Sequence, residues 1–302
     1  PPKDARAFRK ERKMKKNKIK KIIVLGLAMA LTTGVMSACG GESGNDEQKS
    51  SGETVVIAGS TSVQPLSEVM AEEFMADNEG TSVEVQGGGS GQGIKSIQEG
   101  IADIGSLSRE VKDEEKGSVK EEYIIAMDGV AVVVNTETET EDITIEELEK
   151  IYTGEITNWK ELGGKDAEIT VVSREEGSGT RGAFTEITGV LVKDDEGNET
   201  DNTTADALVQ PSTGSVIKTV SSTPDSIGYV SLAAVSDEVK ALKVEGVEPS
   251  KDTVLDGTYK ISRPFVYVTG NDISESAKAF IDFVLSDKGQ ELVEENGFIP
   301  VQ

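Results

Sequence analysis

Three short stretches rich in glycine and hydroxyl side chains each join an apolar strand pattern to a helical pattern. They are AGSTSVQP (58–65), GGGSGQG (87–93) and EEGSGTRG (175–182). The start of a helix presents backbone N–H groups without partners and a partial positive charge of about half an electron. One such turn usually only reverses the chain. Three of the same construction, one of them directly after Arg174, predict a site for a tetrahedral oxyanion between several helix ends.

The order of the patterns from Thr54 onward predicts an α/β fold with parallel sheets, because apolar strands alternate with helices. Strands are predicted at 54–60, 82–86, 102–108, 129–135, 168–173, 225–232 and 263–270. The stretch GVAVVVN (129–135) is apolar throughout, so it is predicted to be buried on both faces. A capping box at Thr144–Glu147 opens a helix that is expected to end at Gly154. The polar stretch 193–204 is predicted to be a surface loop, and its acids do not have the spacing of an EF-hand.

The chain contains no histidine and a single cysteine. A Ser-His-Asp triad, a Cys-His dyad and a histidine metal site are therefore excluded, as is an internal disulfide. A hydrolase built on Ser178 would need a lysine base, which neither the GSG turn nor its neighbours supply. We therefore expect a binding protein and not an enzyme, with neither a cofactor nor a metal.

The first 38 residues are predicted to be a targeting segment and not part of the fold. Five lysines between positions 15 and 21 precede the apolar run Ile22–Met36, and small residues follow before Cys39. The run is shorter than the roughly 20 residues that a membrane span needs. The pattern resembles a bacterial lipoprotein signal. This implies that Cys39 carries the lipid, palmitate included, becomes the mature N-terminus, and anchors the protein to the outer side of the cell membrane.

Met14 is the expected start, which leaves residues 1–13 as an upstream extension, and residues 39–53 are expected to form the lipidated end and a polar linker. Of the 31 basic residues 11 precede Cys39, but only 2 of the 55 acidic residues do, so the remainder carries a formal charge of −33. Such an acidic body is not expected to bind nucleic acid. A dianion about 15 Å from a surface carboxylate is repelled by only about 0.6 kcal/mol in water. One charge-assisted hydrogen bond contributes about 1.5–3 kcal/mol, so local donors decide whether an anion binds.

Several segments, taken in order, resemble the phosphate-binding lipoproteins of the phosphate-specific ABC transporter. They are GSTSVQP, GGGSGQGIKSI, ADIGSLSRE, IYTGEITNW, SREEGSGTRGAF, SIGYV and AKAFIDFVLSDKGQELVEENGFIPV. The resemblance implies a two-lobed periplasmic-binding-protein fold of type II, with two crossovers and phosphate in the cleft. Lobe 1 is then expected to comprise residues 54–130 and 266–302, and lobe 2 residues 131–265. The implied partners are inorganic phosphate, the permease subunits of the transporter and, through Cys39, the membrane; the protein is expected to be a monomer.

The resemblance also places phosphate-binding groups on the three turns. They are Thr61, Ser62, Ser90, Ser178, Gly179 and Thr180, which offer backbone and hydroxyl donors, and Arg174, which offers a charged fork. Glu176 occupies the place where the family often has an acid that orients the arginine. The alternative for Arg174 is a surface salt bridge with Glu175 or Glu176.

The sequence departs from the family pattern at Ser108, where many members carry an aspartate that accepts a proton from phosphate. Sulfate has no proton to donate, so a buried carboxylate discriminates against it. We predict that Asp128 takes over this role, with Ser108 and Arg109 also at the ligand; Asp103 is the second candidate acceptor. Alternatively, Asp128 caps the strand end or pairs with Arg109. Sulfate or another oxyanion remains an alternative ligand, and an envelope lipoprotein without a ligand remains an alternative function.

Overall fold

A single mixed sheet runs through both lobes of the protein. The computed structural model describes residues 53–194 and 198–301. The sheet has nine strands in the order β2-β1-β3-β13-β4-β10-β6-β9, and β11 pairs with β4. The bounds are β1 Thr54–Gly59, β2 Ser82–Gly87, β3 Ile104–Leu107, β4 Glu121–Val134, β6 Thr170–Arg174, β9 Leu208–Gln210, β10 Ser226–Ser231, β11 Lys240–Ala241 and β13 Ser262–Thr269.

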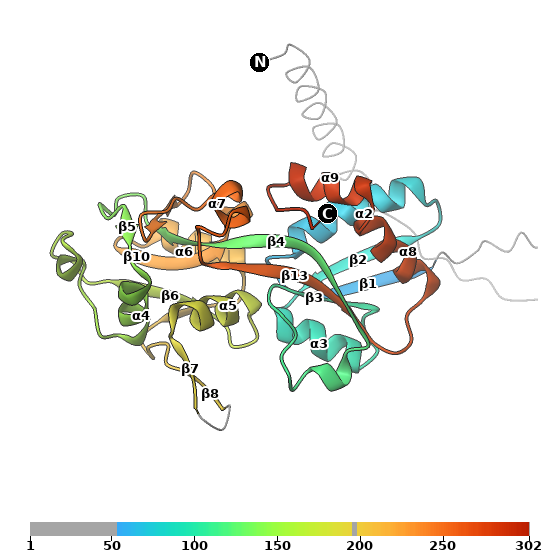
Figure 1. The fold of residues 1–302 in the computed structure, drawn as a ribbon, viewed down its shortest axis with the longest axis horizontal. Coiled ribbons are helices and arrows are strands. Elements are labelled where there is room, and N and C mark those ends of the chain that lie inside the picture. The colour runs from blue at the N-terminus through green and yellow to red at the C-terminus, as the bar shows by residue number, and fades with distance from the viewer. Residues whose placement is uncertain (1–52, 195–197, 302) are drawn as a thin grey trace, which may run out of the picture. The chain divides into compact units, whose positions relative to one another are not determined.

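Lobe 1 is built on β2, β1, β3, β13 and the first part of β4. Its helices are α2 (Gln64–Asp77), α3 (Ser90–Gln98), α8 (Glu275–Val284) and α9 (Asp287–Glu295). Helix α2 follows β1, and α3 follows β2. Strand β1 pairs in parallel with both β2 and β3. Helices α2, α8 and α9 lie on one face of this sheet and α3 on the other (Figure 1). A separate apolar cluster fills each side, one around Leu66 and Phe280 and one around Ile94 and Val268.

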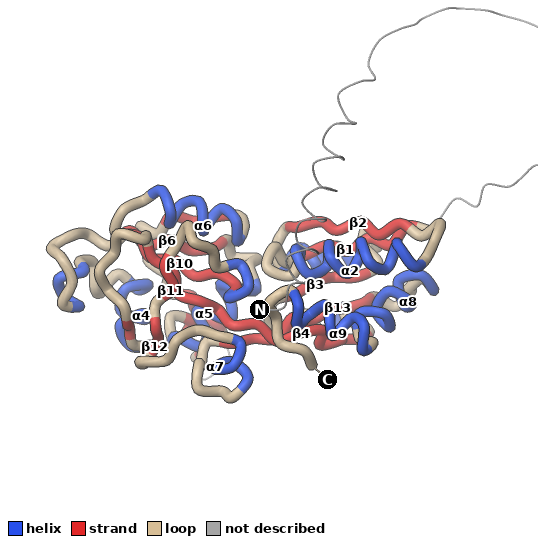
Figure 2. Tube along the Cα trace, turned by 90° about the horizontal axis from the view of Figure 1, so that it is seen from above, coloured by secondary structure: helices blue, strands red, loops and turns tan. Residues whose placement is uncertain are grey.

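Lobe 2 places helices on both faces of β4, β10, β6 and β9 in the same way (Figure 2). Its helices are α4 (Ile145–Thr153), α5 (Gly179–Thr188), α6 (Thr213–Ser222) and the short α7 (Lys251–Leu255). Along β4, Val130, Val132 and Val134 join the cluster that contains Phe184 of α5. The alternate residues Ala131 and Val133 join the cluster under α6. This confirms that the apolar run is buried on both faces, since neither set of side chains faces water.

Strand β4 passes from one lobe to the other between Gly129 and Val130. Up to Gly129 it pairs with β13, where Ser262 lies opposite Gly129. From Val130 it pairs with β10 in antiparallel register. The two crossover strands β4 and β13 are visible in Figure 1 between the two groups of helices. The lobe limits given above stay a prediction, while the two-lobed type II architecture is the observed one.

Several local predictions can be compared with the structure. The capping box is confirmed, because Thr144 Oγ1 accepts from Glu147 N at 3.1 Å and Gly154 ends α4 with φ 82°. The prediction of a loop over 193–204 is wrong in part: β7 (Leu191–Lys193) and β8 (Glu199–Asp201) form an antiparallel pair. Strands β7 and β8 are short and mostly exposed, so their sequences do not alternate between apolar and polar residues and do not indicate a strand. A second small pair joins β5 (Asp142–Ile143) to β12 (Lys243–Val244).

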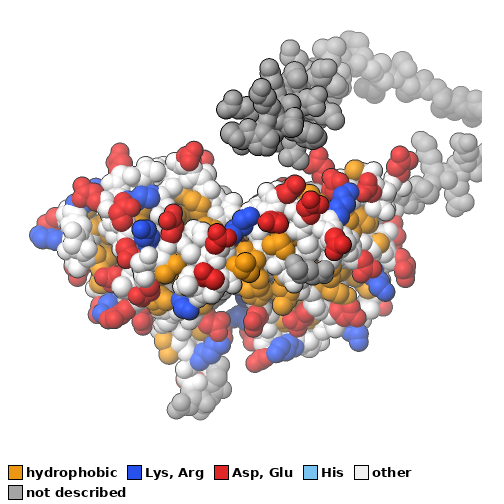
Figure 3. All heavy atoms as spheres, turned by 45° about the horizontal axis from the view of Figure 1, so that its top comes forward, with side chains coloured by type: hydrophobic (Ala, Val, Ile, Leu, Met, Phe, Trp, Pro, Cys, Tyr) orange, Lys and Arg blue, Asp and Glu red, His pale blue; other side chains and the backbone are white. Residues whose placement is uncertain are grey.

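Acidic side chains are spread over both lobes on the face shown in Figure 3, with fewer Lys and Arg side chains among them. Within the two described ranges, no helix combines the length and the apolar character that crossing a membrane requires. The predicted signal segment and Cys39 lie outside the described residues.

Candidate functional site

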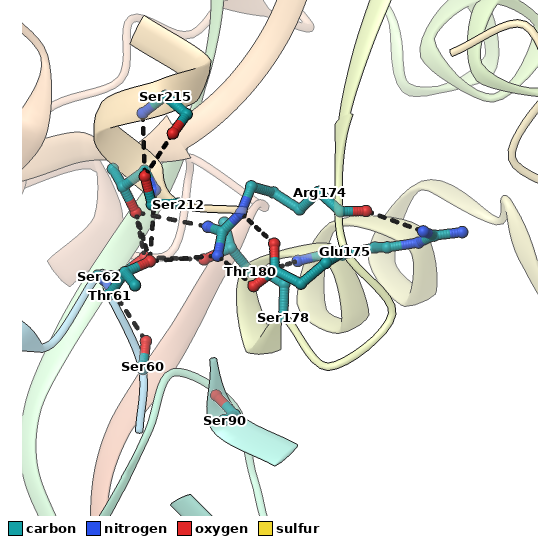
Figure 4. Close-up of polar contacts among 12 residues, drawn as sticks. Ser60, Thr61, Ser62, Ser90, Arg174, Glu175, Ser178, Thr180, Ser212 and Ser215 are labelled. Atoms are coloured by element: carbon teal, nitrogen blue, oxygen red, sulfur yellow. Dashed lines mark hydrogen bonds and ion pairs between the residues drawn. The ribbon is translucent and has the colours of Figure 1, made fainter. Parts of the chain in front are cut away.

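The first turn of lobe 1 runs from β1 into α2 and brings three hydroxyl residues to the edge of the cleft. Gly59 has φ 144°, and a Cβ there would lie 2.1 Å from Ser106 O, so only glycine lets the end of β1 lie this close to β3. Ser60 Oγ then accepts from Ser62 N at 3.2 Å and donates to Ser108 Oγ at 2.8 Å. The turn is thereby fixed, with Thr61 and Ser62 facing lobe 2 (Figure 4).

The second turn of lobe 1 places Ser90 at the start of α3. Ser90 is fully buried, and its Oγ accepts from Ser108 N at 3.1 Å. Ser108, at the end of β3, is also fully buried. Ser90 and Ser108, both predicted to contact the ligand, are therefore hydrogen-bonded to each other.

Arg174 at the end of β6 supplies a buried positive charge to the lobe 2 side of the cleft. Its side chain is 2% exposed. Its Nε and Nη2 donate to the two carboxylate oxygens of Glu175 at 2.8 and 2.7 Å, and Nη2 also donates to Thr61 Oγ1 across the cleft at 3.1 Å. The acid that orients the arginine is therefore Glu175, and the expectation for Glu176 is corrected. The ion pair weighed as an alternative exists, but its arginine is buried between the lobes and does not lie on the surface.

The backbone of Arg174 is held from behind by two further residues of lobe 2. Tyr229 Oη accepts from Arg174 N at 3.2 Å, and burial raises the pKa of Tyr229 to about 12, so it remains a neutral phenol. Arg181 Nη1 donates to Arg174 O at 2.8 Å, while Arg181 Nε donates to Asp201 at 2.7 Å. This shell fixes the direction in which the guanidinium leaves the strand.

The two lobes meet through hydroxyl groups and helix starts. Ser62 Oγ lies 2.8 Å from Thr180 Oγ1 of α5 and 3.0 Å from Thr213 Oγ1 of α6. A Cβ on Gly179 would lie 2.2 Å from Ser90 Oγ. Ser178 caps α5 by accepting from Arg181 N at 3.2 Å. Thr61, Ser62, Ser90, Ser108, Arg174, Ser178, Gly179 and Thr180 are thus brought together between the lobes, as Figure 4 shows for those that it labels.

The two remaining predicted site residues have partners that the sequence did not reveal. Arg109 forms a fork to Glu115 of its own lobe, with both distances 2.7 Å, and its Cγ lies 3.1 Å from the Cβ position of Gly179. Asp128 accepts from Arg263 Nη2 at 3.1 Å and from Ser231 Oγ at 3.0 Å. The alternative in which Asp128 pairs with Arg109 is therefore wrong.

The carboxyl group of Asp128 is fully buried beside a charge. Burial raises its pKa above the ordinary value of 3.8, although Arg263 and Ser231 act in the opposite direction. Asp103, the other candidate acceptor, instead accepts from Val56 N of β1 at 2.8 Å and is half-buried.

The sequence did not indicate two further residues, Thr213 at the site and Arg263 beside Asp128. Thr213 belongs to the turn PSTGS (211–215), a fourth strand–turn–helix junction, which was missed because the preceding strand β9 is short and partly exposed. Its construction was visible in the sequence, and Ser212 caps α6 as Ser178 caps α5. Arg263 had no local signal, because its partner lies 135 residues away. Across the described residues, no group of three or more acidic, cysteine or histidine side chains is arranged to hold a metal ion.

Comparison with known proteins places this architecture in a family. The model of the PBP superfamily domain matches residues 44–288. The phosphate-binding protein PstS of Bacillus subtilis is 36% identical over 95% of both chains. PstS of Borreliella burgdorferi is 33% identical over 94% of this chain and 100% of its own. The chain belongs to the PstS family.

Solved structures resemble this PstS-family chain as well. A Clostridium perfringens protein, described as a phosphate ABC transporter substrate-binding protein and solved with bound phosphate, has a TM-score of 0.77 and 43% identity. The match covers 83% of this chain and 100% of that one. An ABC-type phosphate transport receptor from Vibrio cholerae has a TM-score of 0.68 and 36% identity, over 81% and 99% of the two chains. At these identities the likeness extends to sequence and is not confined to the fold.

The arrangement is suited to hold a small oxyanion by hydrogen bonds. It combines neutral hydroxyl donors, helix-start amides and a buried guanidinium in a place where water has little access, and such donors are stronger there than in bulk water. None of these groups is a histidine, since the chain has none.

Proposed function

We propose that this PstS-family chain captures inorganic phosphate outside the cytoplasm and delivers it to the permease of an ABC transporter. The observation that carries the proposal is the meeting of the two lobes at three places, where Ser62 contacts Thr180, Thr61 contacts Arg174 and Ser90 lies against Gly179. A tetrahedral anion offers acceptors in several directions at once, so donors from both lobes bind it best when the lobes close on it.

We propose that the ligand is contacted by the hydroxyl and amide groups of the turns and by the guanidinium of Arg174. The contacting residues are Thr61, Ser62, Ser90, Ser108, Arg109, Arg174, Ser178, Gly179 and Thr180. Arg174 reaches Thr61 already, which supports a guanidinium directed into the cleft. The overall negative charge of the protein, formally −24, mainly slows approach of the anion.

We propose that Asp128 accepts the proton of phosphate in place of the aspartate that Ser108 replaces. Its burial supports this role, because a carboxylate facing sulfate would have no proton to accept and would be left unpaired in a dry place. Selection of phosphate over sulfate then follows from Asp128. Sulfate, or another tetrahedral oxyanion, is the second candidate ligand, because Asp128 is already engaged with Arg263.

The transport role requires a position at the membrane, and we propose that lipid on Cys39 provides it. The polar linker up to residue 53 would let the folded part reach the permease. We place lobe 1 at residues 54–130 and 266–302 and lobe 2 at 131–265; the change of the partner of β4 from β13 to β10 between Gly129 and Val130 supports the first of these limits. In this role the protein acts as a monomer, binds no nucleic acid and makes or breaks no bond in its ligand.

Calorimetry with the full chain tests the proposal, titrating phosphate and then sulfate at one fixed ionic strength. We expect one phosphate per chain, and sulfate binding at least about 100-fold weaker, since an unpaired buried charge costs more than the roughly 1–3 kcal/mol of a neutral group. Equal affinities would favour the wider oxyanion receptor. Absence of binding for both anions would favour an envelope lipoprotein without a ligand.

A further inference from the structure

Arg263 is a buried arginine that lies where the chain crosses between the lobes. It is the second residue of β13, and the strand register sets it directly opposite Asp128 of β4. The side chains of Arg263 and Asp128 are each 1% exposed and are joined by one bond, Nη2 to Oδ2 at 3.1 Å. This position puts a buried guanidinium on a strand that crosses between the lobes.

Two of the nitrogens of Arg263 have no acceptor. Nε and Nη1 are buried and find no hydrogen-bond partner within the described part of the chain. The centre of the Phe265 ring lies 5.5 Å from the guanidinium carbon, so the ring offers its π face to the cation and no oxygen acceptor. A buried donor without an acceptor is costly, and more so when it carries charge. The arrangement therefore fits a molecule that supplies an acceptor to both nitrogens.

The surroundings of Arg263 indicate the kind of acceptor. The guanidinium of Arg174 is near enough to repel it: burial lowers the pKa of Arg263, Asp128 opposes this, and Arg174 lowers it further. Each arginine has one carboxylate partner, Glu175 or Asp128. An anion that enters near both guanidinium groups relieves their mutual repulsion, whereas a neutral acceptor does not.

Arg263 also faces the space between the lobes. It lines a cavity of about 750 Å³ together with Arg109 of lobe 1 and Gly182 of α5. Gly182 and Gly179 both lie against the side chain of Arg109, at the start of α5 that the oxyanion site uses. Arg263 thus lies beside a cavity that is connected to the candidate site through Arg109 and the start of α5.

We propose that Arg263 is a second arginine of the oxyanion site, and that its Nε–H and Nη1–H donate to the anion held in the cleft. The inference rests on the proposed function and deepens it, because it names a residue that distinguishes a charged oxyanion from neutral ligands. Arg174 approaches from lobe 2 and Arg263 from the crossover, so the anion is held between two guanidinium groups.

Four variants of the full chain test this by phosphate calorimetry and thermal unfolding. They are Asp128→Asn, Arg263→Gln, the double variant with both changes, and Lys288→Gln. Arg263→Gln alone leaves a buried carboxylate and is expected to unfold at a lower temperature. The double variant removes both charges and should regain much of that stability, because a neutral amide pair of similar shape replaces a buried ion pair.

The decisive comparison is between Asp128→Asn and the double variant, since Asp128 is absent from both. We expect the double variant to bind phosphate about 10- to 100-fold more weakly, the effect of losing charge-assisted hydrogen bonds. Lys288→Gln removes one positive charge from a surface ion pair with Glu73 and Asp77 and should stay within about twofold of the unmodified chain.

Equal phosphate affinity in Asp128→Asn and the double variant would overturn the inference and leave Arg263 as a structural partner of Asp128. If the unmodified chain itself bound no phosphate, the proposed function would fail together with the inference. If it bound phosphate and only the Arg263 comparison showed no change, the function would stand without Arg263.

Discussion

The helices that open onto the cleft begin differently in the two lobes. In lobe 2, Ser178 Oγ accepts from Arg181 N at 3.2 Å and Ser212 Oγ accepts from Ser215 N at 3.1 Å, so α5 and α6 are capped by their own side chains. In lobe 1, α2 begins after Val63 and α3 after Gly89, and among the described residues neither has a side-chain cap.

One helix start of lobe 1 is capped instead by the other lobe. Gly91 N of α3 donates to Gly177 O at 3.0 Å, across the cleft. We call the helix starts that face the cleft the wall of each lobe. The lobe 2 wall has side-chain caps of its own and carries the charge of Arg174, whereas a helix-start amide of the lobe 1 wall finds its acceptor only when the lobes close. An anion at the helix starts would serve lobe 1 in the same manner, because the first amides of a helix need acceptors. Closure and ligand binding should hence be coupled mainly through lobe 1.

The largest effect is expected from removing the charge of the lobe 2 wall, with Arg174→Met. The variant loses the guanidinium donors to the anion and leaves Glu175 facing it, so phosphate should bind more weakly by about 3–5 kcal/mol, roughly 150- to 5,000-fold. Calorimetry measures the affinity and thermal unfolding checks the fold. Arg174→Lys is the control that keeps the charge without the fork, and it should recover part of the loss. Binding by Arg174→Met within tenfold of the unmodified chain would contradict the assignment of the charge to this wall.

A smaller effect is expected from separating the two walls, with Gly179→Ala. The new Cβ would lie 2.2 Å from Ser90 Oγ and 2.8 Å from Ser108 Oγ, so these hydroxyl groups must shift, and we expect lobe 1 to move away with them. Phosphate affinity should fall roughly 10-fold, the effect of losing one or two hydrogen bonds across the cleft. The folded state itself should not suffer, because alanine favours the first turn of α5.

Gly214→Ala is the matched control for the wall separation, since Gly214 lies in the first turn of α6 and a Cβ there meets no atom within 4 Å. It should leave phosphate affinity unchanged. Small-angle scattering in saturating phosphate should show a more open molecule for Gly179→Ala than for Gly214→Ala. Equal scattering and equal affinity would mean that contact between Gly179 and Ser90 does not limit closure.

The sequence predicted most of the strands and turns because their signals are local. Alternation of apolar residues and Gly/Ser turns located β1, β2 and β6. The capping box was recognised in the same way, because it is encoded by Thr144 and Glu147, which lie three residues apart. The first half of β4, from Glu121, was not predicted, since its acidic residues mask the strand pattern and its pairing with β13 decides its conformation.

The sequence could predict which turns meet, but not which charged side chains pair. The repeated Gly/Ser turn pattern selected Ser62, Ser90 and Thr180, which the structure brings between the lobes. The pairing of Asp128 with Arg263 depends on the register of two strands far apart in the chain, and no short pattern encodes a register. Whether Arg174 pairs with Glu175 or with Glu176 depends on the direction of a side chain at a turn, which the sequence does not reveal either.

The smallest effect concerns the support behind the lobe 2 wall, where Asp201 holds Arg181 and Arg181 holds the carbonyl of Arg174. Burial alone would raise the pKa of Asp201, but hydrogen bonds from Arg181 and Thr203 outweigh it and lower the pKa below its ordinary value of 3.8. A lowered pKa means that the folded state favours the carboxylate. The stabilisation is therefore complete above pH 3.8 and is lost as the pH falls through the folded-state pKa.

Asp201→Asn should accordingly lower the free energy of unfolding at pH 7 by about 0.5–1 kcal/mol, a value kept small because this side chain is 26% exposed and the ion pair is screened. Urea unfolding at a series of pH values measures the difference, which should shrink towards zero as the pH falls below 3.8. Asp237→Asn, at an exposed position of the same lobe, is the control and should change the free energy of unfolding at pH 7 by no more than about 0.5 kcal/mol. A difference for Asp201→Asn that persisted undiminished into acid would mean that its hydrogen bonds, and not its charge, support the wall. The self-sufficiency of lobe 2 would then rest on geometry alone.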